Sequence, residues 1–316
     1  RKKPLANKIA KLKLDLDEID EFLTLRHAIE RNKTISLRDP QRDPEKNPGS
    51  GTLKSGDPLT DSFVKQRMKT RYDLYWNDET GTWSGGNSRA KKFLDIANDV
   101  DQIVRETMNT TVAGGLISRE NADVIMDSYK YYAPLRGKDI EDDYAESIIV
   151  NAGLSTKGKE TLRAMGRESA AQSPLGHILL NAERAIARSI KNKEFGQRLV
   201  NLIKAAPDDA FWRVISPEDP RMSRGFEKKF TYVGKDPELQ GRKFSEIPEG
   251  MDRKDFLQLI TVKKDFLSPI MDKDLIGVKV GGQQVYVELN DPRMRDAVVS
   301  MDIGTVDKLL QKFGIV

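Results

Sequence analysis

The chain has 316 residues, enough for two domains of ordinary size with a hydrophobic core. Its 53 Lys and Arg residues against 49 Asp and Glu give a net charge of +4, far from the basic excess of a dedicated nucleic-acid coat protein. The absence of cysteine excludes disulfide bonds, thiolate nucleophiles and cysteine-based zinc or iron–sulfur sites. No apolar run approaches the roughly 20 residues that cross a bilayer, so we expect no membrane span.

Apolar residues recur at the 3.6-residue spacing of amphipathic helices along much of the first 205 residues. Thr60 and Ser118 are candidate N-caps, and Gly114-Gly115 is a typical helix stop. The resulting helices are expected at residues 5–32, 60–75, 88–113, 118–132 and 174–205.

Prolines and glycines separate these helices. Four prolines between residues 36 and 60 push the residues before them out of the helical region, so we expect a long exposed excursion there. Residues 77–87, rich in Gly, Trp, Asn and Asp, indicate a turn, and residues 138–168 indicate loops around short helices.

The pattern changes after Pro207. Residues 211–215 and 229–233 have the composition of strands. Residues 276–289 predict a β-hairpin, because Gly281-Gly282 suits a turn that needs positive φ. A closing amphipathic helix is expected at residues 302–313. The predicted fold class is therefore mainly α with a smaller α+β C-terminal part, that is, a helical bundle-like region followed by a β-hairpin-containing region.

The expected domain organisation follows the same boundaries. It comprises an N-terminal long helix at 1–35, a Pro/Gly-rich linker at 36–59, a helical domain at 60–206 and an α+β domain at 207–316. The chain starts at Arg1 without methionine and ends at Ile315-Val316 without a polar tail. We therefore expect a segment of a longer protein, with the α+β domain truncated at its C-terminus.

Histidine chemistry has two candidates, His27 and His177. A catalytic interpretation would pair His27 as base with Glu30 as its orienting carboxylate. The commoner alternative is a polar contact on or between helices, and capping or packing is the commoner role for His177. Two separated histidines do not make a zinc site, so we predict no catalytic residue, no metal and no cofactor, and therefore no enzyme.

An acidic cluster follows in the weakly patterned region, at Glu141, Asp142, Asp143 and Glu146. Paired carboxylates serve hydrolases, and oxygen clusters bind hard metals. The stretch lacks EF-hand spacing, however, and a solvated charged loop is the commoner case. The glycine pairs are not phosphate loops, because no Gly-Lys-Ser/Thr follows them.

Nucleic-acid contact is the strongest positive signal among the residues alone. Basic residues recur along the helix expected at 174–205, and a second group precedes the aromatic residues near Tyr72 and Tyr75. Such groups hold phosphates while aromatic rings stack on bases. The candidate residues are Arg184, Arg188, Lys191, Arg198, Lys65, Arg67, Lys69 and Arg71. The alternative is a solvated amphipathic face, because Glu183 and Glu194 interrupt the stripe.

Two strings of residues carry a family resemblance. The first contains Arg26-His27-Ala28 and Glu30-Arg31-Asn32, with Gly49-Ser50-Gly51 further on. The second runs from Gly115-Leu116-Ile117-Ser118 to Tyr129, Tyr132 and Pro134. In this order and spacing they resemble conserved blocks of the large polyvalent proteins of phages and integrative elements. Residues 182–202 and 277–292 resemble later blocks of the same family.

The resemblance implies a role rather than a chemistry. Such proteins are often packaged in phage particles and delivered with DNA; some carry helicase and methyltransferase domains linked to defence against restriction. The leading hypothesis is a non-enzymatic structural module of an internal virion or DNA-ejection protein. The alternative is an accessory DNA-binding or docking region of an antirestriction protein. A hydrolase that uses Glu30 or the cluster at 141–146 is the third hypothesis.

The implied partners and locations follow from the family. The partners are other virion or ejection proteins, or further domains of the same long chain, with DNA as a further candidate and an oligomer as a further form. The implied location is the phage virion and, after infection, the bacterial host cell.

Overall fold

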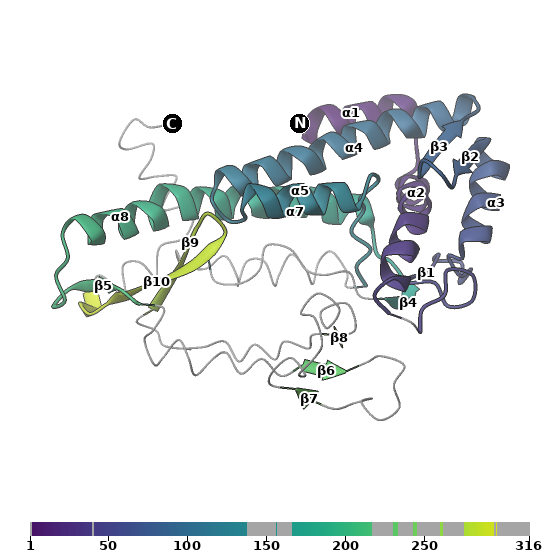
Figure 1. Ribbon diagram of the computed structural model, residues 1–316. Helices are drawn as coiled ribbons and strands as arrows, with labels where there is room; N and C mark the ends of the chain where they lie inside the picture. The colour runs from purple at the N-terminus through teal and green to yellow at the C-terminus, as the bar shows by residue number, and fades with distance from the viewer. Residues whose placement is uncertain are drawn as a thin grey trace.

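The computed structural model describes residues 2–39, 41–137, 156, 166–216, 230–232, 243–244, 260–261, 275–293 and 295. Within them the fold is mainly α with a smaller α+β part, as the sequence predicts. The helices are α1 (Lys2–Leu12), α2 (Leu16–Ser36), α3 (Asp61–Tyr72), α4 (Ser88–Ala113), α5 (Arg119–Ser128), α7 (Pro174–Ile190), the π-helix η1 (Lys191–Gln197) and α8 (Arg198–Ala205) (Figure 1).

The single helix predicted at residues 5–32 is in fact two helices. Lys13 adopts a left-handed conformation with φ of 53°, which ends α1. Asp15 then caps α2, since its carboxylate accepts hydrogen bonds from the backbone N–H groups of Asp17 and Glu18. The apolar spacing continues through the break, and for this reason the sequence pattern did not reveal it.

The caps predicted for the next helices are confirmed. Thr60 Oγ1 accepts a hydrogen bond from the N–H of Phe63 at the start of α3, and Ser118 caps α5 in the same way through the N–H of Asn121. Gly114 is the C-cap of α4. The helix expected to reach residue 132 ends at Ser128, because Tyr129 adopts an extended conformation.

The turn expected at residues 77–87 belongs to a β-hairpin that the sequence analysis missed. Strands β2 (Leu74–Asn77) and β3 (Thr82–Gly85) pair antiparallel and place Trp76 opposite Trp83. The two indole rings meet edge to face, with centroids 5.1 Å apart. Polar residues and glycines hide the alternation of apolar and polar side chains in so short a hairpin.

The described residues of the excursion between Ser36 and Thr60 form no α-helix, as the prolines predict, but the excursion is exposed only in part: residues 54–58 are exposed, whereas residues 48–51 are buried. Leu53, Leu59 and Ser50 are buried. A side chain at Gly49 would lie 2.6 Å from Ile35 Cδ1, so only glycine fits against α2 there. Strand β1 (Ser50–Thr52) pairs in parallel with β4 (Arg167–Ala170).

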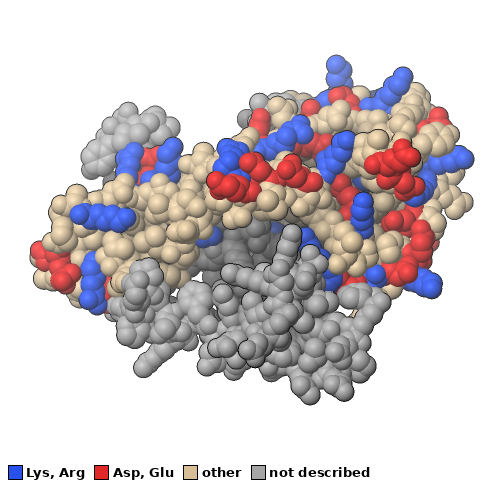
Figure 2. All heavy atoms as spheres, viewed as in Figure 1, with Lys and Arg blue, Asp and Glu red and all other residues tan. Residues whose placement is uncertain are grey.

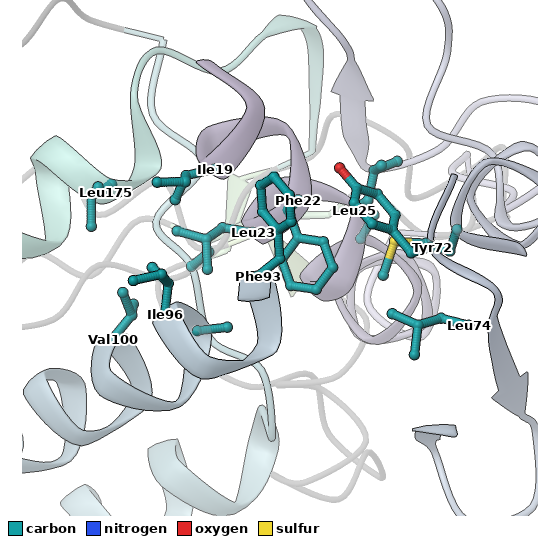
Figure 3. Packing of buried hydrophobic residues seen from close by; sticks show 14 of the residues in the cluster. Ile19, Phe22, Leu23, Leu25, Tyr72, Leu74, Phe93, Ile96, Val100 and Leu175 are labelled. Atoms are coloured by element: carbon teal, nitrogen blue, oxygen red, sulfur yellow. The ribbon is translucent and has the colours of Figure 1, made fainter. Parts of the chain in front are cut away.

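The main core lies between α2, α3 and α4. Phe22 of α2 meets Tyr72 of α3 and Phe93 of α4, with ring centroids 5.0 and 5.4 Å apart (Figure 3). Helix α4 also packs along α7, and α1 packs on α4 (Figure 1). Burial of these aromatic and aliphatic side chains stabilises the helical region, at about 1.5–3 kcal/mol for each large side chain.

The helix predicted at 174–205 is continuous, but its middle turns form η1. Its C-terminal part packs on a small antiparallel sheet of β5 (Trp212–Val214), β10 (Gln283–Leu289) and β9 (Leu275–Val280). The predicted hairpin at 276–289 is confirmed, with positive φ at Gly281 and Gly282. A second sheet contains β7 (Lys243–Phe244), β6 (Phe230–Tyr232) and β8 (Ile260–Thr261), and β6 confirms the strand predicted at 229–233.

Two expectations lie outside the described residues. They are the closing helix at 302–313 and the acidic cluster at Glu141, Asp142, Asp143 and Glu146. The loops and short helices expected at 138–168 lie outside them as well, apart from residues 156 and 166–168. The domain boundaries stay a prediction.

Candidate functional site

The two strings of residues that the sequence analysis singled out meet in space. Glu30, near the C-terminal end of α2, accepts hydrogen bonds from the backbone N–H groups of Lys130 and Tyr131, at 2.9 and 2.8 Å. These two residues belong to the tyrosine segment, residues 129–137, which follows α5. About 100 positions separate the partners in the chain, so this contact fixes the path of the chain across the fold.

His27 lies one turn before Glu30 on α2 and also takes part in this contact. Its Nδ1 lies 2.8 Å from Glu30 Oε1, and the side chain is only 1% exposed. The imidazole meets the rings of Tyr129 and Tyr132 edge-on, with centroids 5.2 and 5.8 Å apart. Burial lowers the pKa of His27, so the ring is neutral at pH 7 and its Nδ1–H donates to Glu30.

Arg26 and Tyr131 extend the contact toward α4 and the β2–β3 hairpin. Arg26 forms a bidentate ion pair with Asp101, at 3.1 and 2.5 Å, and its guanidinium lies 5.0 Å from the centre of the Tyr131 ring. The Trp83 indole donates to the Arg26 carbonyl, and the Trp83 N–H donates to Tyr131 Oη. Burial raises the pKa of Asp101 and outweighs the opposing effect of Arg26.

Asn32 forms hydrogen bonds with the segment that follows α2. Its Nδ2 donates to the Leu59 carbonyl and to Asp61 Oδ1, both at 2.8 Å, and its Oδ1 accepts from the N–H of Ser50 at 2.9 Å. The side chain is 1% exposed. Asn32 therefore holds the middle and the C-terminal end of the excursion between α2 and α3, and burial raises the pKa of its partner Asp61 to about 6.

Of the other residues in the two strings, Arg31 is buried beside Tyr129 and Tyr132, and burial lowers the pKa of its guanidinium. Pro134 is buried too, between Ala133 and Leu135. We call Arg26, His27, Glu30, Arg31 and Asn32 the α2 clasp. Its imidazole and carboxylate bind rings and backbone amides of other segments, which is the geometry of an inter-segment contact and not of a solvent-facing base.

A second polar centre lies in η1, and the sequence analysis missed it. Asn192 is fully buried, and its Oδ1 accepts from the N–H of Lys279 at 2.7 Å and from Thr156 Oγ1 at 2.8 Å. Its Nδ2 donates to the carbonyls of Lys279 at 2.6 Å and of Gly114 at 2.7 Å. All four hydrogen-bonding positions of the carboxamide are filled.

Asn192 thus pairs with the backbone of β9 as a neighbouring strand would. The π-helical turn also brings Gly196 against β9, where an added Cβ would lie 3.0 Å from Val278 Cγ1. A glycine and an asparagine inside an apolar helical stripe were the available signal, because both are poor interior helix formers. π-Helical turns often occur at functional sites.

The predicted nucleic-acid residues before Tyr72 lie close to carboxylates. Lys65 pairs with Asp78, Arg67 with Glu21, and Arg71 with Glu21 and Glu18. Lys69 lies over the ring of Tyr75 instead. Figure 2 shows the same mixture of basic and acidic side chains over the visible face of the described residues.

The predicted stripe on α7, η1 and α8 is also mixed. Arg198 is 65% exposed and pairs with Glu194 at 2.5 Å. Lys191 is 2% exposed, so it does not lie on the surface where the stripe placed it. Burial and the nearby charge of Arg188 lower its pKa to about 8. Contact of the remaining residues, Arg184 and Arg188 included, with DNA stays a prediction.

Among the residues that the structure describes, no three His, Asp or Glu side chains come together as a metal site would require. None of the described helices is long and apolar enough to span a bilayer. Searches against protein-family models, curated proteins and solved structures return no match to this chain.

Proposed function

We propose that the chain is a non-enzymatic structural module of a large phage-encoded protein, packaged with the genome and delivered alongside it as an internal virion or DNA-ejection protein. The family resemblance of the two strings suggests the biological setting. The fold supplies the support for a structural role, because the residues of the first string bind other segments of the same chain.

The observation that carries this proposal is the meeting of the two strings at Glu30. A catalytic carboxylate needs a free face toward a substrate. Here the Glu30 carboxylate binds the His27 imidazole and two backbone N–H groups, and these contacts hold the tyrosine segment on α2. The partners of such a module would be other virion or ejection proteins, or further domains of the same chain.

The alternative function is an accessory DNA-binding or docking region of an antirestriction protein. It has less support, because Lys65, Arg67 and Arg71 each lie within ion-pairing distance of a carboxylate. Competition with these carboxylates weakens phosphate binding. The two functions differ in their prediction for DNA affinity, which should be weak for a structural module.

Mass spectrometry of purified phage particles tests the leading proposal. We expect peptides of residues 1–316 in intact particles and their loss from particles that have ejected their DNA in vitro. A non-packaged phage protein of similar abundance serves as the control for contamination. Absence of the parent protein from intact particles would contradict the proposal.

A DNA-binding measurement distinguishes the alternative from the leading proposal. It compares the full parent protein with a variant in which Arg184, Arg188 and Arg198 are changed to Gln. The structural module predicts that the two proteins bind DNA with equal affinity. A loss of affinity in the variant, together with a steep dependence of wild-type affinity on salt, would favour the DNA-binding alternative.

A further inference from the structure

The tyrosine segment, residues 129–137, is buried at Ala133, Pro134 and Leu135, whereas its first four residues, 129–132, are exposed or half-buried. Glu30 accepts its two backbone N–H groups, and the rings of Tyr129 and Tyr132 pack against His27. The preceding helix α5 has only Ala122 buried. Segments with few buried apolar contacts open with low free energy. The described contacts of residues 129–132 with α2 are made by Glu30, by His27 and, over the Tyr131 ring, by Arg26.

His27 is poorly placed to accept a second proton. Its Nδ1 faces Glu30, while its Nε2 is buried and has no hydrogen-bond partner among the residues that the structure describes. Arg26 and Arg31 are the charged neighbours on α2 besides Glu30, and the tyrosine segment contributes only the neutral rings of Tyr129 and Tyr132. A protonated Nε2 would be a buried donor without an acceptor, beside two guanidinium groups.

We propose that this contact is an acid-sensitive latch, in which protonation of His27 releases residues 129–132 from α2 while the helical core and the buried residues 133–135 stay folded. Opening exposes the imidazole to water, where the second proton is stable. Released from His27, the rings of Tyr129 and Tyr132 become exposed. The inference does not depend on the proposed function.

The direction of the pH effect follows from linkage. Burial lowers the pKa of His27 below its ordinary value in the closed state. The closed state is therefore favoured fully above about pH 6.5, the pKa of an exposed imidazole, and this contribution is lost as the pH falls through the lower pKa of the closed state. The stability of the core changes in the opposite direction as the pH falls. Burial raises the pKa values of Asp20 and Asp61, so their contribution to stability grows at lower pH.

Hydrogen exchange followed by mass spectrometry on the full chain tests the latch, at pH 7.5, 6.5, 5.5 and 5.0, with rates corrected for intrinsic exchange. We expect the protection of peptides covering 129–132 to fall about tenfold or more between pH 7.5 and 5.0, since one proton gives up to tenfold per pH unit. Peptides of α3 and α4 should keep their protection.

The two histidines provide matched variants. His27→Gln removes the titrating group and should abolish the pH dependence, whereas His177→Gln should leave it intact. Equal protection of residues 129–132 at all four pH values in the wild type would overturn the latch, as would a parallel loss in α3 and α4. An NMR titration of the wild type keeps the test decisive if His27→Gln does not fold, because a His27 signal that titrates at its ordinary pKa in the closed state also excludes the latch.

Discussion

Two buried asparagines, Asn32 in the α2 clasp and Asn192 in η1, perform the same task in unlike surroundings. Each joins backbone groups of segments far apart in the chain. Asn32 lies beside the large aromatic core of α2, α3 and α4, whereas Asn192 lies beside the small apolar cluster between α8 and the β5–β10–β9 sheet. We expect the first core to stay packed without its asparagine and the second sheet to need its asparagine.

The difference shows how the size of a core sets the importance of a polar contact. In the helical region, apolar burial around Phe22 provides most of the stabilising free energy. In the C-terminal sheet, the carboxamide of Asn192 pairs with the outer edge of β9: it accepts from the Lys279 N–H and, together with Gln197, donates to the Lys279 carbonyl. We therefore expect the same substitution to alanine to reduce the unfolding free energy by different amounts at the two positions.

Asn192→Ala should have the largest effect. It removes four buried hydrogen bonds and leaves the Lys279 N–H without its acceptor, and we expect a loss of about 3–4 kcal/mol of unfolding free energy, with loss of the β9–β10 hairpin. Urea unfolding and hydrogen exchange of peptides covering 275–289 measure it. Gln197→Ala is the matched control, because Gln197 makes weaker contacts with the same carbonyls, and about 1 kcal/mol is expected. Equal losses in both variants would show that Asn192 is not the centre of the contact.

Asn32→Ala should have a smaller and more local effect. The excursion at 37–60 loses its anchor, at about 2–3 kcal/mol, but α3 and α4 stay protected because their aromatic core remains. Hydrogen exchange of peptides covering 48–60 against those of α4 measures the difference. If α4 lost protection to the same degree as the excursion, the contrast between the two asparagines would fail.

Asp61→Asn tests the Asn32 contact through the pH dependence of stability. Asp61 has its pKa raised to about 6, above that of an unfolded aspartate, so its contribution to stability is fully present below about pH 4 and is lost as the pH rises through about 6. Asparagine keeps an oxygen for the Asn32 amide but does not titrate. We expect the wild type to gain on the order of 1 kcal/mol relative to the variant between pH 7 and 4. Urea unfolding at these two pH values measures it, and a difference that is independent of pH would contradict the assignment.

Arg198→Ala should have the smallest effect. The pair of Arg198 with Glu194 is exposed and spans one helical turn, so we expect a change within about 0.5 kcal/mol. Thermal unfolding of the variant beside the wild type is sufficient. A loss above 1 kcal/mol would mean that exposed charges, and not the Asn192 contact, stabilise this helix.

The sequence predicted what depends on local patterns. The caps Thr60 and Ser118, the stop at Gly114 and the hairpin turn at Gly281-Gly282 each follow from the chemistry of one or two residues. The break at Lys13 was missed because apolar spacing continues across it, and the buried part of the excursion was missed because prolines report local conformation alone.

The site was predicted only in part, for a different physical reason. The two strings were identified by resemblance, and a polar contact between segments was the preferred role of His27. The partners of Glu30 lie 100 positions away and are backbone N–H groups, which carry no sequence signal. Asn192 was missed for the same reason, since its main partner is the backbone of Lys279.

The most direct test of the account is native-state hydrogen exchange, by NMR, of three backbone amides that donate to side chains of the α2 clasp or to Asn192. These are Ser50 to Asn32, Tyr131 to Glu30 and Lys279 to Asn192. The account predicts that at pH 7.5 all three are protected well above their neighbours in the same irregular or edge segments. Exchange of these amides at the rate of unstructured peptides would contradict the claim that buried polar side chains of α2 and η1 hold the fold together.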